Sequence, residues 1–256
     1  MAAHALLSPS SAARWLACTP SARMEEMFPD RAGEAAAEGT LAHALGELLL
    51  RQAKGEITTR KYNSELKRIA ESEYYSPEMQ ELMEGYRDFV LSQWEEAKKI
   101  TPDAELLLET KLDLREWVED GFGTGDAQII ADRTLRIIDL KYGKGVTVSA
   151  TDNKQMMLYA LGAIREASIF YDIDRVHMTI YQPRTDNVSD FTMNVIDLLD
   201  WAEKELKPRA AMAYAGDGDL VPGDHCLFCK AKVRCRAYAG KQLEIAKYEF
   251  RAADLL

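Results

Sequence analysis

GTGDAQIIADRTLRIIDLKYG, residues 123–143, is the stretch that decides the fold. Two mainly apolar runs, residues 125–131 and 134–140, flank the polar pair Asp132 and Arg133. Short apolar runs on either side of a tight polar turn are typical of paired antiparallel strands. The stretch therefore predicts a β-hairpin with its turn at Asp132 and Arg133.

The segments around this hairpin predict both helices and further strands. Apolar residues at helical spacing and helix-opening residues indicate helices over residues 8–18, 41–52, a long stretch from Pro77, 152–167 and 198–214. Alternating or β-rich runs indicate strands at residues 105–110, 175–182 and 190–195. Thr40 is the expected cap of the second helix, whereas residues 55–76 are too polar to assign.

This order of elements favours an α/β fold with a mixed central sheet flanked by helices. The chain has 256 residues, of which 47% are hydrophobic and 29% charged, and this is an ordinary globular composition. We find no internal repeat and no low-complexity segment. We therefore expect a single domain over residues 1–256.

The charge and the ends of the sequence limit the function classes. A formal net charge of -10 argues against a protein that coats nucleic acid non-specifically, because such proteins carry a basic excess. It does not exclude a nuclease, whose metal-binding carboxylates add to the negative count. The N-terminus lacks a signal-peptide pattern, and no apolar run approaches membrane-spanning length. We expect a cytoplasmic protein.

The hairpin carries a group of residues with metal chemistry. Asp126 lies at the start of one strand and Asp139 at the end of its partner, so that pairing brings two carboxylates together. A divalent cation such as Mg²⁺ relieves their repulsion. Lys141 projects from the same strand face as Asp139 because side chains repeat every two residues. Metal and lysine together fit phosphodiester hydrolysis, although an Asp-x-Lys alone also fits a solvated hairpin.

Several motifs together resemble the PD-(D/E)XK nuclease superfamily, and within it the RecB-like branch that includes the CRISPR-adaptation nuclease and phage-encoded enzymes. The motifs are GTLAH at residues 39–43, GD at 125–126, DLK at 139–141 and Gln-x-x-x-Tyr at 155–159. The resemblance spans most of the chain and implies a restriction-endonuclease-like fold.

The same resemblance implies roles for the motif residues. His43, Asp126 and Asp139 would be ligands of Mg²⁺ or Mn²⁺. Lys141 would stabilise or position the attacking water.

Other residues near these motifs have two interpretations each. By resemblance, Gln155 and Tyr159 orient the site or a substrate phosphate, but they are also an ordinary i, i+4 helical pair. His43 could instead be a hydrogen-bonded core residue. Glu47 could fix the imidazole tautomer of His43 or lie on the surface. Glu109 could add a carboxylate to the site, and we rank it below the others.

Three of the four cysteines lie within ten residues of one another, at Cys226, Cys229 and Cys235, and the fourth is Cys18. Closely spaced thiolates can share a metal, and the fourth ligand can come from elsewhere in the fold. This spacing fits zinc as well as iron. Four unrelated buried thiols are the alternative, and His225 could replace a cysteine as ligand.

The resemblance favours iron, because RecB-like nucleases with one N-terminal and three C-terminal cysteines often carry a 4Fe-4S cluster. The expected metal subregion is formed by residues 8–20 and 222–240, with zinc as the alternative metal. In relatives the N-terminal cysteine often directly precedes a proline. Here Thr19 lies between Cys18 and Pro20. A cluster here would join the two ends of the chain.

The resemblance implies a metal-dependent deoxyribonuclease, an exonuclease that acts on DNA in phage recombination or replication. A single-strand annealing recombinase is a candidate partner. The alternatives are a catalytically inactive DNA-binding protein and a zinc-stabilised assembly protein. Basic and aromatic side chains that could contact DNA are Arg133, Arg136, Lys144, Lys154, Trp117, Phe122 and Tyr142.

Overall fold

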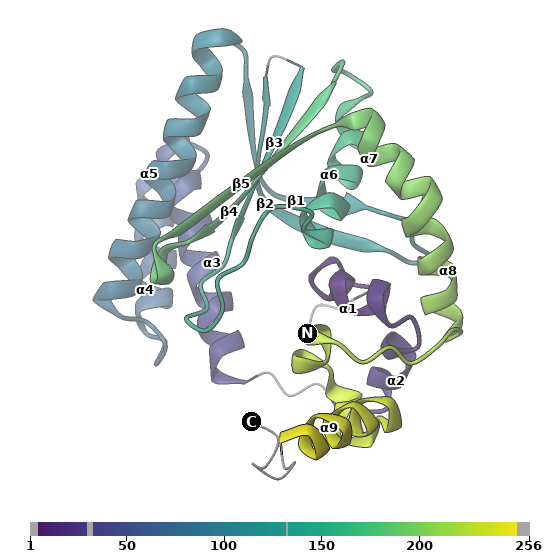
Figure 1. Cartoon of the computed structure of the whole chain (residues 1–256). Coiled ribbons are helices and arrows are strands. Elements are labelled where there is room, and N and C mark those ends of the chain that lie inside the picture. The colour runs from purple at the N-terminus through teal and green to yellow at the C-terminus, as the bar shows by residue number, and fades with distance from the viewer. Residues whose placement is uncertain (1–4, 30–32, 132, 250–256) are drawn as a thin grey trace. The chain divides into compact units, whose positions relative to one another are not determined.

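The computed structural model describes residues 5–29, 33–131 and 133–249, which fall into two compact units (Figure 1). Unit 1 comprises Met1–Asp30, Leu114–Gly121 and Asp200–Leu256, and unit 2 comprises Arg31–Asp113 and Phe122–Leu199. The prediction of a single domain over the whole chain stays a prediction.

Unit 2 is built on one five-stranded mixed sheet in the order β1-β2-β3-β4-β5. Its strands are β1 (Glu105–Asp113), β2 (Phe122–Ala131), β3 (Thr134–Leu140), β4 (Arg175–Gln182) and β5 (Asn187–Asn194). All neighbours are antiparallel except β3 and β4, which are parallel. A parallel pair needs a crossover, and α6 (Lys154–Ala167) provides it. The predicted mixed α/β sheet is confirmed.

The predicted hairpin is β2 and β3, paired from Ala127↔Ile138 to Ala131↔Thr134. The limits of β3 and β4 agree with the prediction, whereas β2 and β5 begin three residues earlier, at Phe122 and Asn187. Asp132 of the predicted turn lies outside the described residues. Arg133 has a φ of 54°, which is a left-handed turn conformation.

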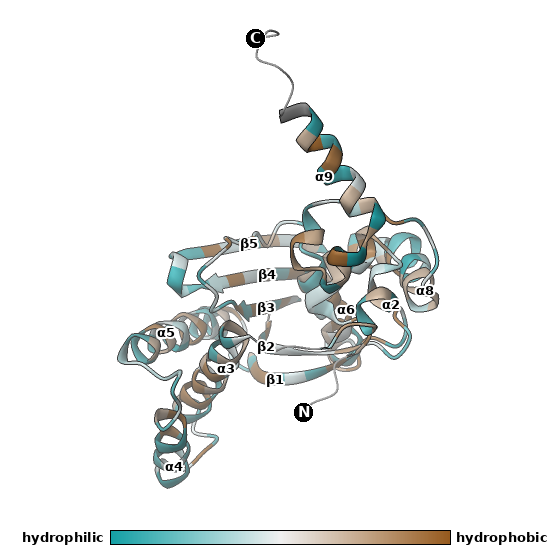
Figure 2. Cartoon of the chain, turned by 90° about the horizontal axis from the view of Figure 1, so that it is seen from below, coloured by the Kyte–Doolittle hydropathy of each residue, from teal (hydrophilic) through white to brown (hydrophobic). Residues whose placement is uncertain are grey.

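Helices cover both faces of this sheet. On one side lie α3 (Glu34–Ala53) and α5 (Pro77–Ile100), with α4 (Thr59–Ala70) beside α3, and on the other side lies α6 (Figures 1 and 2). The core between α3, α5 and the sheet includes Leu45, Leu49, Met83, Ile129 and Ile138, each at most 2% exposed. Burial of these apolar side chains is the main stabilising contribution in the unit.

Two helices begin at capping residues, and one of these caps also positions the site. Ser76 Oγ accepts a hydrogen bond from Met79 N at 3.1 Å, and Pro77 occupies the first helical position of α5. Asn153 Oδ1 accepts from Gln155 N at 3.1 Å and from Met156 N at 3.3 Å. The second cap fixes the start of α6 and therefore the position of Gln155.

One prediction about the early helices was wrong, and a further helix lies in the segment that the sequence left unassigned. Helix α3 begins at Glu34, so Thr40 lies inside it, and Thr40 Oγ1 donates to the Ala36 carbonyl at 2.9 Å instead of capping the helix. The unassigned polar segment contains α4, which is capped by Thr58 and buries only Ile69. So little apolar surface gives a weak periodic signal.

Unit 1 gathers segments from both ends of the sequence. It contains α1 (Ala12–Ala17) and α2 (Ser21–Glu26), then α8 (Lys207–Ala215) and α9 (Arg236–Glu249). Thr19 Oγ1 donates to the Asp217 carbonyl at 2.5 Å, and Lys230 N donates to Glu25 Oε1 at 2.7 Å. The N-terminal and C-terminal segments are therefore in direct contact.

The predicted helix over residues 198–214 is present but is not regular. Helix α7 (Val195–Trp201) and α8 are separated by a π-helical stretch, Ala202–Leu206. Pro208 follows that stretch, and a proline lacks the N–H for the helical ladder and crowds the carbonyl four residues earlier. The wider turn accommodates it. No helix in the described ranges combines the length and apolarity needed to cross a membrane.

Candidate metal site

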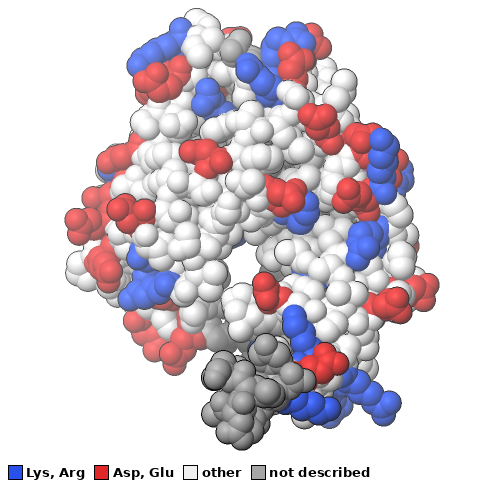
Figure 3. All heavy atoms as spheres, viewed as in Figure 1, with Lys and Arg blue, Asp and Glu red and all other residues white. Residues whose placement is uncertain are grey.

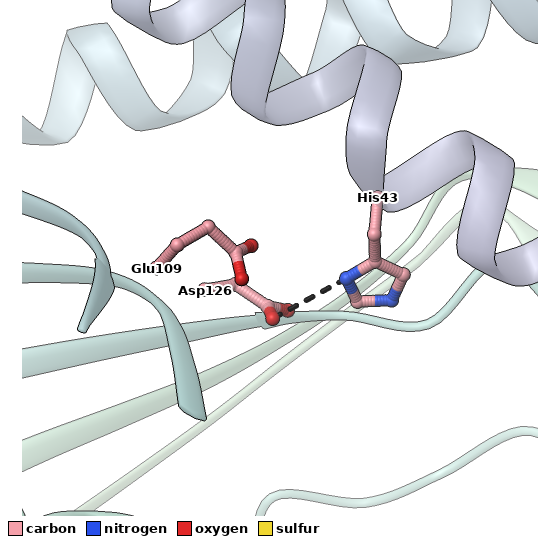
Figure 4. Close-up of side chains that lie close together, drawn as sticks. All are labelled: His43, Glu109 and Asp126. Carbon is pink, nitrogen blue, oxygen red and sulfur yellow. Dashed lines mark ion pairs between the residues drawn. The ribbon is translucent and has the colours of Figure 1, made fainter. Parts of the chain in front are cut away.

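Three elements of unit 2 bring together an imidazole and two carboxylates. His43 comes from α3, Glu109 from β1 and Asp126 from β2, and one ligand atom of each lies within 4.8 Å of the other two (Figure 4). His43 Nδ1 is 3.3 Å from Asp126 Oδ1. Nitrogen and carboxylate oxygen donors of this kind suit a divalent cation. The three residues are therefore a candidate metal site.

Glu109 reaches this site through an unusual backbone conformation. The pairs Leu108↔Ala127 and Thr110↔Gly125 keep the same register on either side of it, which places Glu109 opposite Asp126. Its φ of 49° lies in the left-handed region, which costs a non-glycine residue about 1 kcal/mol or more. Strain of this kind, maintained inside a strand, is typical of functional positions. Here it accompanies the approach of two carboxylates.

Asp126 is held by the backbone of the neighbouring strand. Pairing between β2 and β3 stops at Ala127↔Ile138, so Asp126 lies just beyond the paired part. Its Oδ2 accepts a hydrogen bond from Leu140 N at 2.7 Å, while Oδ1 faces His43. One oxygen is thus used to fix the side chain, and the other is directed toward the candidate metal site.

A second network surrounds Asp139 on β3. Asp139 is 2% exposed; its Oδ1 accepts from Gln155 Nε2 at 3.0 Å, and its Oδ2 lies 2.7 Å from Lys141 Nζ in an ion pair. Lys141 Nζ also donates to Gln155 Oε1 at 3.0 Å, and Gln155 Nε2 donates to Tyr159 OH at 3.0 Å. The amide of Gln155 therefore links Asp139, Lys141 and Tyr159.

From the sequence we expected Asp139 beside His43 and Asp126, whereas the structure places Glu109 nearest to them. Among the described residues, the ligand atoms that approach within 4.8 Å belong to His43, Glu109 and Asp126. Asp139 instead contacts Lys141 and Gln155. The sequence offered one signal for Glu109, a carboxylate in the strand before the hairpin, but its place opposite Asp126 depends on strand register.

The pKa values reflect this crowding of acids. Burial lowers the pKa of His43, but Asp126 and Asp139 outweigh it and raise that pKa to about 9. Burial, helped by Asp126 and Glu47, raises the pKa of Glu109 to about 7. Burial also raises the pKa of Asp139, although Lys141 opposes the shift. A cation would relieve this accumulation of negative charge.

Glu47 contacts Arg51, which agrees with the surface alternative considered for it. Its Oε1 accepts from Arg51 Nε at 2.7 Å, and Arg51 also pairs with Glu56 at 2.7 Å. This i, i+4 pair lies along the surface of α3. The imidazole of His43, with a side chain 35% exposed, faces Asp126.

Substituting Glu109 tests its part in the site. We expect Glu109→Gln to weaken Mn²⁺ binding about tenfold or more, because it removes one anionic ligand of nearly unchanged size. Isothermal titration with Mn²⁺ measures the change. Glu105→Gln, on the exposed start of the same strand, is the control and should bind as the unmodified protein does. Equal affinity in both variants would remove Glu109 from the site.

The four cysteines line one pocket of unit 1. Cys18, Cys226 and Cys229 are buried, Cys235 is half-buried, and none forms a disulfide. Gly223 N donates to Cys226 Sγ at 3.4 Å. Burial raises the thiol pKa of Cys18, as do the neighbouring Cys226 and Cys235. Among the described residues, no three of these sulfur atoms lie within 4.8 Å of one another, unlike the ligand atoms at His43.

Most of the residues considered for DNA contact have other uses. Trp117 and Tyr142 are 6% and 4% exposed, so their rings cannot stack on bases, whereas Phe122 is 46% exposed. Arg133 forms a two-pronged pair with Asp174, with distances of 2.5 and 2.8 Å. On the face shown in Figure 3, basic side chains are interspersed with acidic ones.

Solved structures and a family model match this chain. The structure of SSO0001 is 16% identical over 86% of this chain and 95% of that one, with a TM-score of 0.33. A protein from Eubacterium rectale that carries the name "Putative exonuclease" is 11% identical over 90% of this chain and 88% of its own, with a TM-score of 0.43. The family model, described as "Protein of unknown function (DUF2800)", matches residues 4–256. With nearly its whole length matched, the chain belongs to the DUF2800 family.

Proposed function

We propose that the protein is a divalent-metal-dependent deoxyribonuclease of the PD-(D/E)XK type, with a restriction-endonuclease-like fold. The observation that carries the proposal is the meeting of His43, Glu109 and Asp126 beside the Asp139–Lys141 ion pair. Such a site combines hard anionic donors with an ammonium group, as phosphodiester hydrolysis requires. Mg²⁺ and Mn²⁺ are the ions that fit these donors best.

The site residues have separate tasks in this proposal. His43, Glu109 and Asp126 hold the cation, with Asp139 as the further ligand expected from the sequence. When bound there, a divalent cation would supply positive charge that polarises a phosphoryl oxygen and lowers the pKa of a water molecule. Lys141 stabilises negative charge on the phosphate during attack.

Gln155 and Tyr159 act as positioning residues. The Gln155 amide contacts Asp139, Lys141 and the Tyr159 hydroxyl, so it sets the direction of all three polar groups. Burial raises the pKa of Tyr159, which keeps its hydroxyl protonated and able to donate to a phosphate oxygen.

The test is digestion of end-labelled single- and double-stranded DNA with Mg²⁺ or Mn²⁺, with EDTA in the control. Cleavage with either ion and none with EDTA is the expected result. Labels at the 5′ and 3′ ends separate exonuclease from endonuclease action. DNA binding without cleavage would instead support a catalytically inactive DNA-binding protein. If the protein neither binds nor cleaves DNA, the result would support a zinc-stabilised assembly protein.

More specifically, we propose that the protein acts as an exonuclease in phage recombination or replication. Its proposed partner is a single-strand annealing recombinase. This role rests on the resemblance to RecB-like phage enzymes. Co-purification of the full chain with a single-strand annealing recombinase tests the partnership.

We also propose that the four cysteines bind a 4Fe-4S cluster, with Zn²⁺ as the alternative. Their convergence on one pocket between segments far apart in sequence supports a shared metal. His225 also lines this pocket, but its Nε2 lies 2.8 Å from the Val221 carbonyl. Iron is preferred on the resemblance.

Serine substitutions test this cysteine site. We expect Cys18→Ser and Cys229→Ser to lower metal content and melting temperature to a similar extent, because each removes one of four ligands to the same centre. Metal analysis and visible absorption of protein purified without oxygen give the readout. Loss of metal from Cys229→Ser alone would mean that the three C-terminal cysteines use another ligand.

A further inference from the structure

A second polar pocket lies on the part of the unit 2 sheet formed by β3, β4 and β5. Five side chains line it, namely Thr134, Arg136, Arg175, His177 and Thr192, around a space of about 190 Å³. Strand register explains the grouping, because Arg136 pairs with His177 and His177 with Thr192, while Thr134 pairs with Arg175. Side chains of directly paired residues share one face of a sheet.

This pocket is separate from the candidate metal site. Arg136 and Asp139 are three residues apart on β3, and an odd separation places side chains on opposite faces of a strand. Arg136 Nη1 donates to Gln93 Oε1 of α5 at 3.4 Å. Asp139 instead contacts Gln155 of α6, on the other side of the sheet.

Arg136, one of the residues that line this pocket, has unused hydrogen-bonding capacity. Arg136 Nε is buried and, among the described residues, has no hydrogen-bond partner. The bond from its Nη1 to Gln93 is long. A guanidinium has five N–H donors, and leaving buried ones unpaired costs about 1 kcal/mol or more each. An anion seated in the pocket would supply acceptors.

The nearby carboxylate does not neutralise the pocket. Asp190 Oδ1 accepts from Thr179 Oγ1 at 2.6 Å and lies 3.3 Å from His177 Nε2. The other nitrogen of His177, Nδ1, contacts Thr192 Oγ1 at 2.8 Å. Asp190 is thus directed at His177 and Thr179, and the described residues that line the pocket include Arg136 and Arg175 but no acid.

We propose that this pocket binds a phosphate group. Two guanidinium groups, with threonine hydroxyls beside them, are groups that recognise a tetrahedral oxyanion. A space of about 190 Å³ is large enough to admit a phosphate group. The described lining is polar and cationic, which favours a phosphate group over a base. The phosphate comes from a nucleic-acid strand or from a free ion.

The experiment follows the ring resonances of His177 by NMR in the full-length chain, with divalent cations omitted so that phosphate cannot bind through a metal. One arm titrates inorganic phosphate at constant ionic strength. The other arm titrates a short single-stranded oligonucleotide with and without a 5′-phosphate. We expect a saturable shift of His177. Tighter binding of the oligonucleotide assigns the pocket to nucleic acid, and tighter binding of inorganic phosphate assigns it to the free ion.

Three variants make the result decisive. Arg136→Gln with Arg175→Gln should weaken phosphate binding at least tenfold, because it removes both charged donors. Arg133→Gln is the matched control; Arg133 is paired with Asp174 outside the pocket, and its loss should leave the Kd unchanged. If the double variant does not fold, the exposed Arg175→Gln alone serves the same comparison.

The proposal is wrong if His177 shows no saturable shift with either titrant, or if the arginine variants bind as tightly as the Arg133 control. It does not rest on the proposed nuclease function, since phosphate can bind here whether or not the metal site cleaves DNA. Both outcomes are read without any cleavage assay.

Discussion

Replacing Asp126 with asparagine abolishes DNA cleavage while the protein stays folded; this is the largest effect we expect. The amide oxygen of asparagine can keep the hydrogen bond from Leu140 N, which Asp126 Oδ2 accepts at 2.7 Å. The amide nitrogen then points toward His43, in place of the carboxylate oxygen. The variant therefore keeps the local fold and loses one hard anionic ligand.

The measurement is cleavage of end-labelled DNA with Mn²⁺, together with the melting temperature of the variant. Asp88→Asn on α5, with a side chain 67% exposed, removes the same charge far from the site and should cleave normally. Cleavage by Asp126→Asn at the rate of this control would contradict the site assignment.

Asp139→Asn should have the same effect for a related reason. Its side chain is buried between Lys141 and Gln155, so an amide of similar volume fits but cannot form the ion pair with Lys141. Loss of cleavage with retained melting behaviour is expected. Undiminished activity would leave Asp139 with a structural role only.

Lys141→Ala gives the second large effect, a fall in kcat of about a hundredfold or more, equivalent to roughly 2.7 kcal/mol of transition-state stabilisation. Lys141 Nζ is fixed by Asp139 at 2.7 Å and Gln155 at 3.0 Å. A donor held in this way stabilises developing charge without reorganising. Metal binding should persist, because the lysine is not a ligand.

Single-turnover cleavage and a separate DNA-binding titration distinguish catalysis from affinity. Lys99→Ala is the control, since Lys99 is a lysine of α5 with a side chain 68% exposed. If Lys141→Ala weakened DNA binding and left the single-turnover rate unchanged, Lys141 would be a binding residue.

Short stretches of sequence were enough to predict some of the strands and helix starts. The limits of β3 and β4 follow from β-rich, partly apolar runs bounded by turn residues. Pro77, preceded by the capping Ser76, marks the start of α5 because both residues act within one helical turn. The same local reasoning failed at Thr40, where a threonine that can cap a helix lies inside one.

The sequence also predicted which chemistry the hairpin carries. Asp126, Asp139 and Lys141 could be placed near one another because a two-strand hairpin relates them by simple periodicity. Their detailed partners could not be predicted. Asp126 is fixed by a backbone N–H of β3, and Asp139 by an amide from α6.

By itself, then, the sequence determined the mixed α/β fold, the hairpin and the candidate Asp and Lys residues, since these depend on contacts close in the chain. Only the tertiary structure decided that Glu109 joins His43 and Asp126, and that Arg136, His177 and Thr192 form one row. The physical reason is register. Which residues face each other across separate strands depends on how the whole sheet and its helices pack, and no local pattern specifies that.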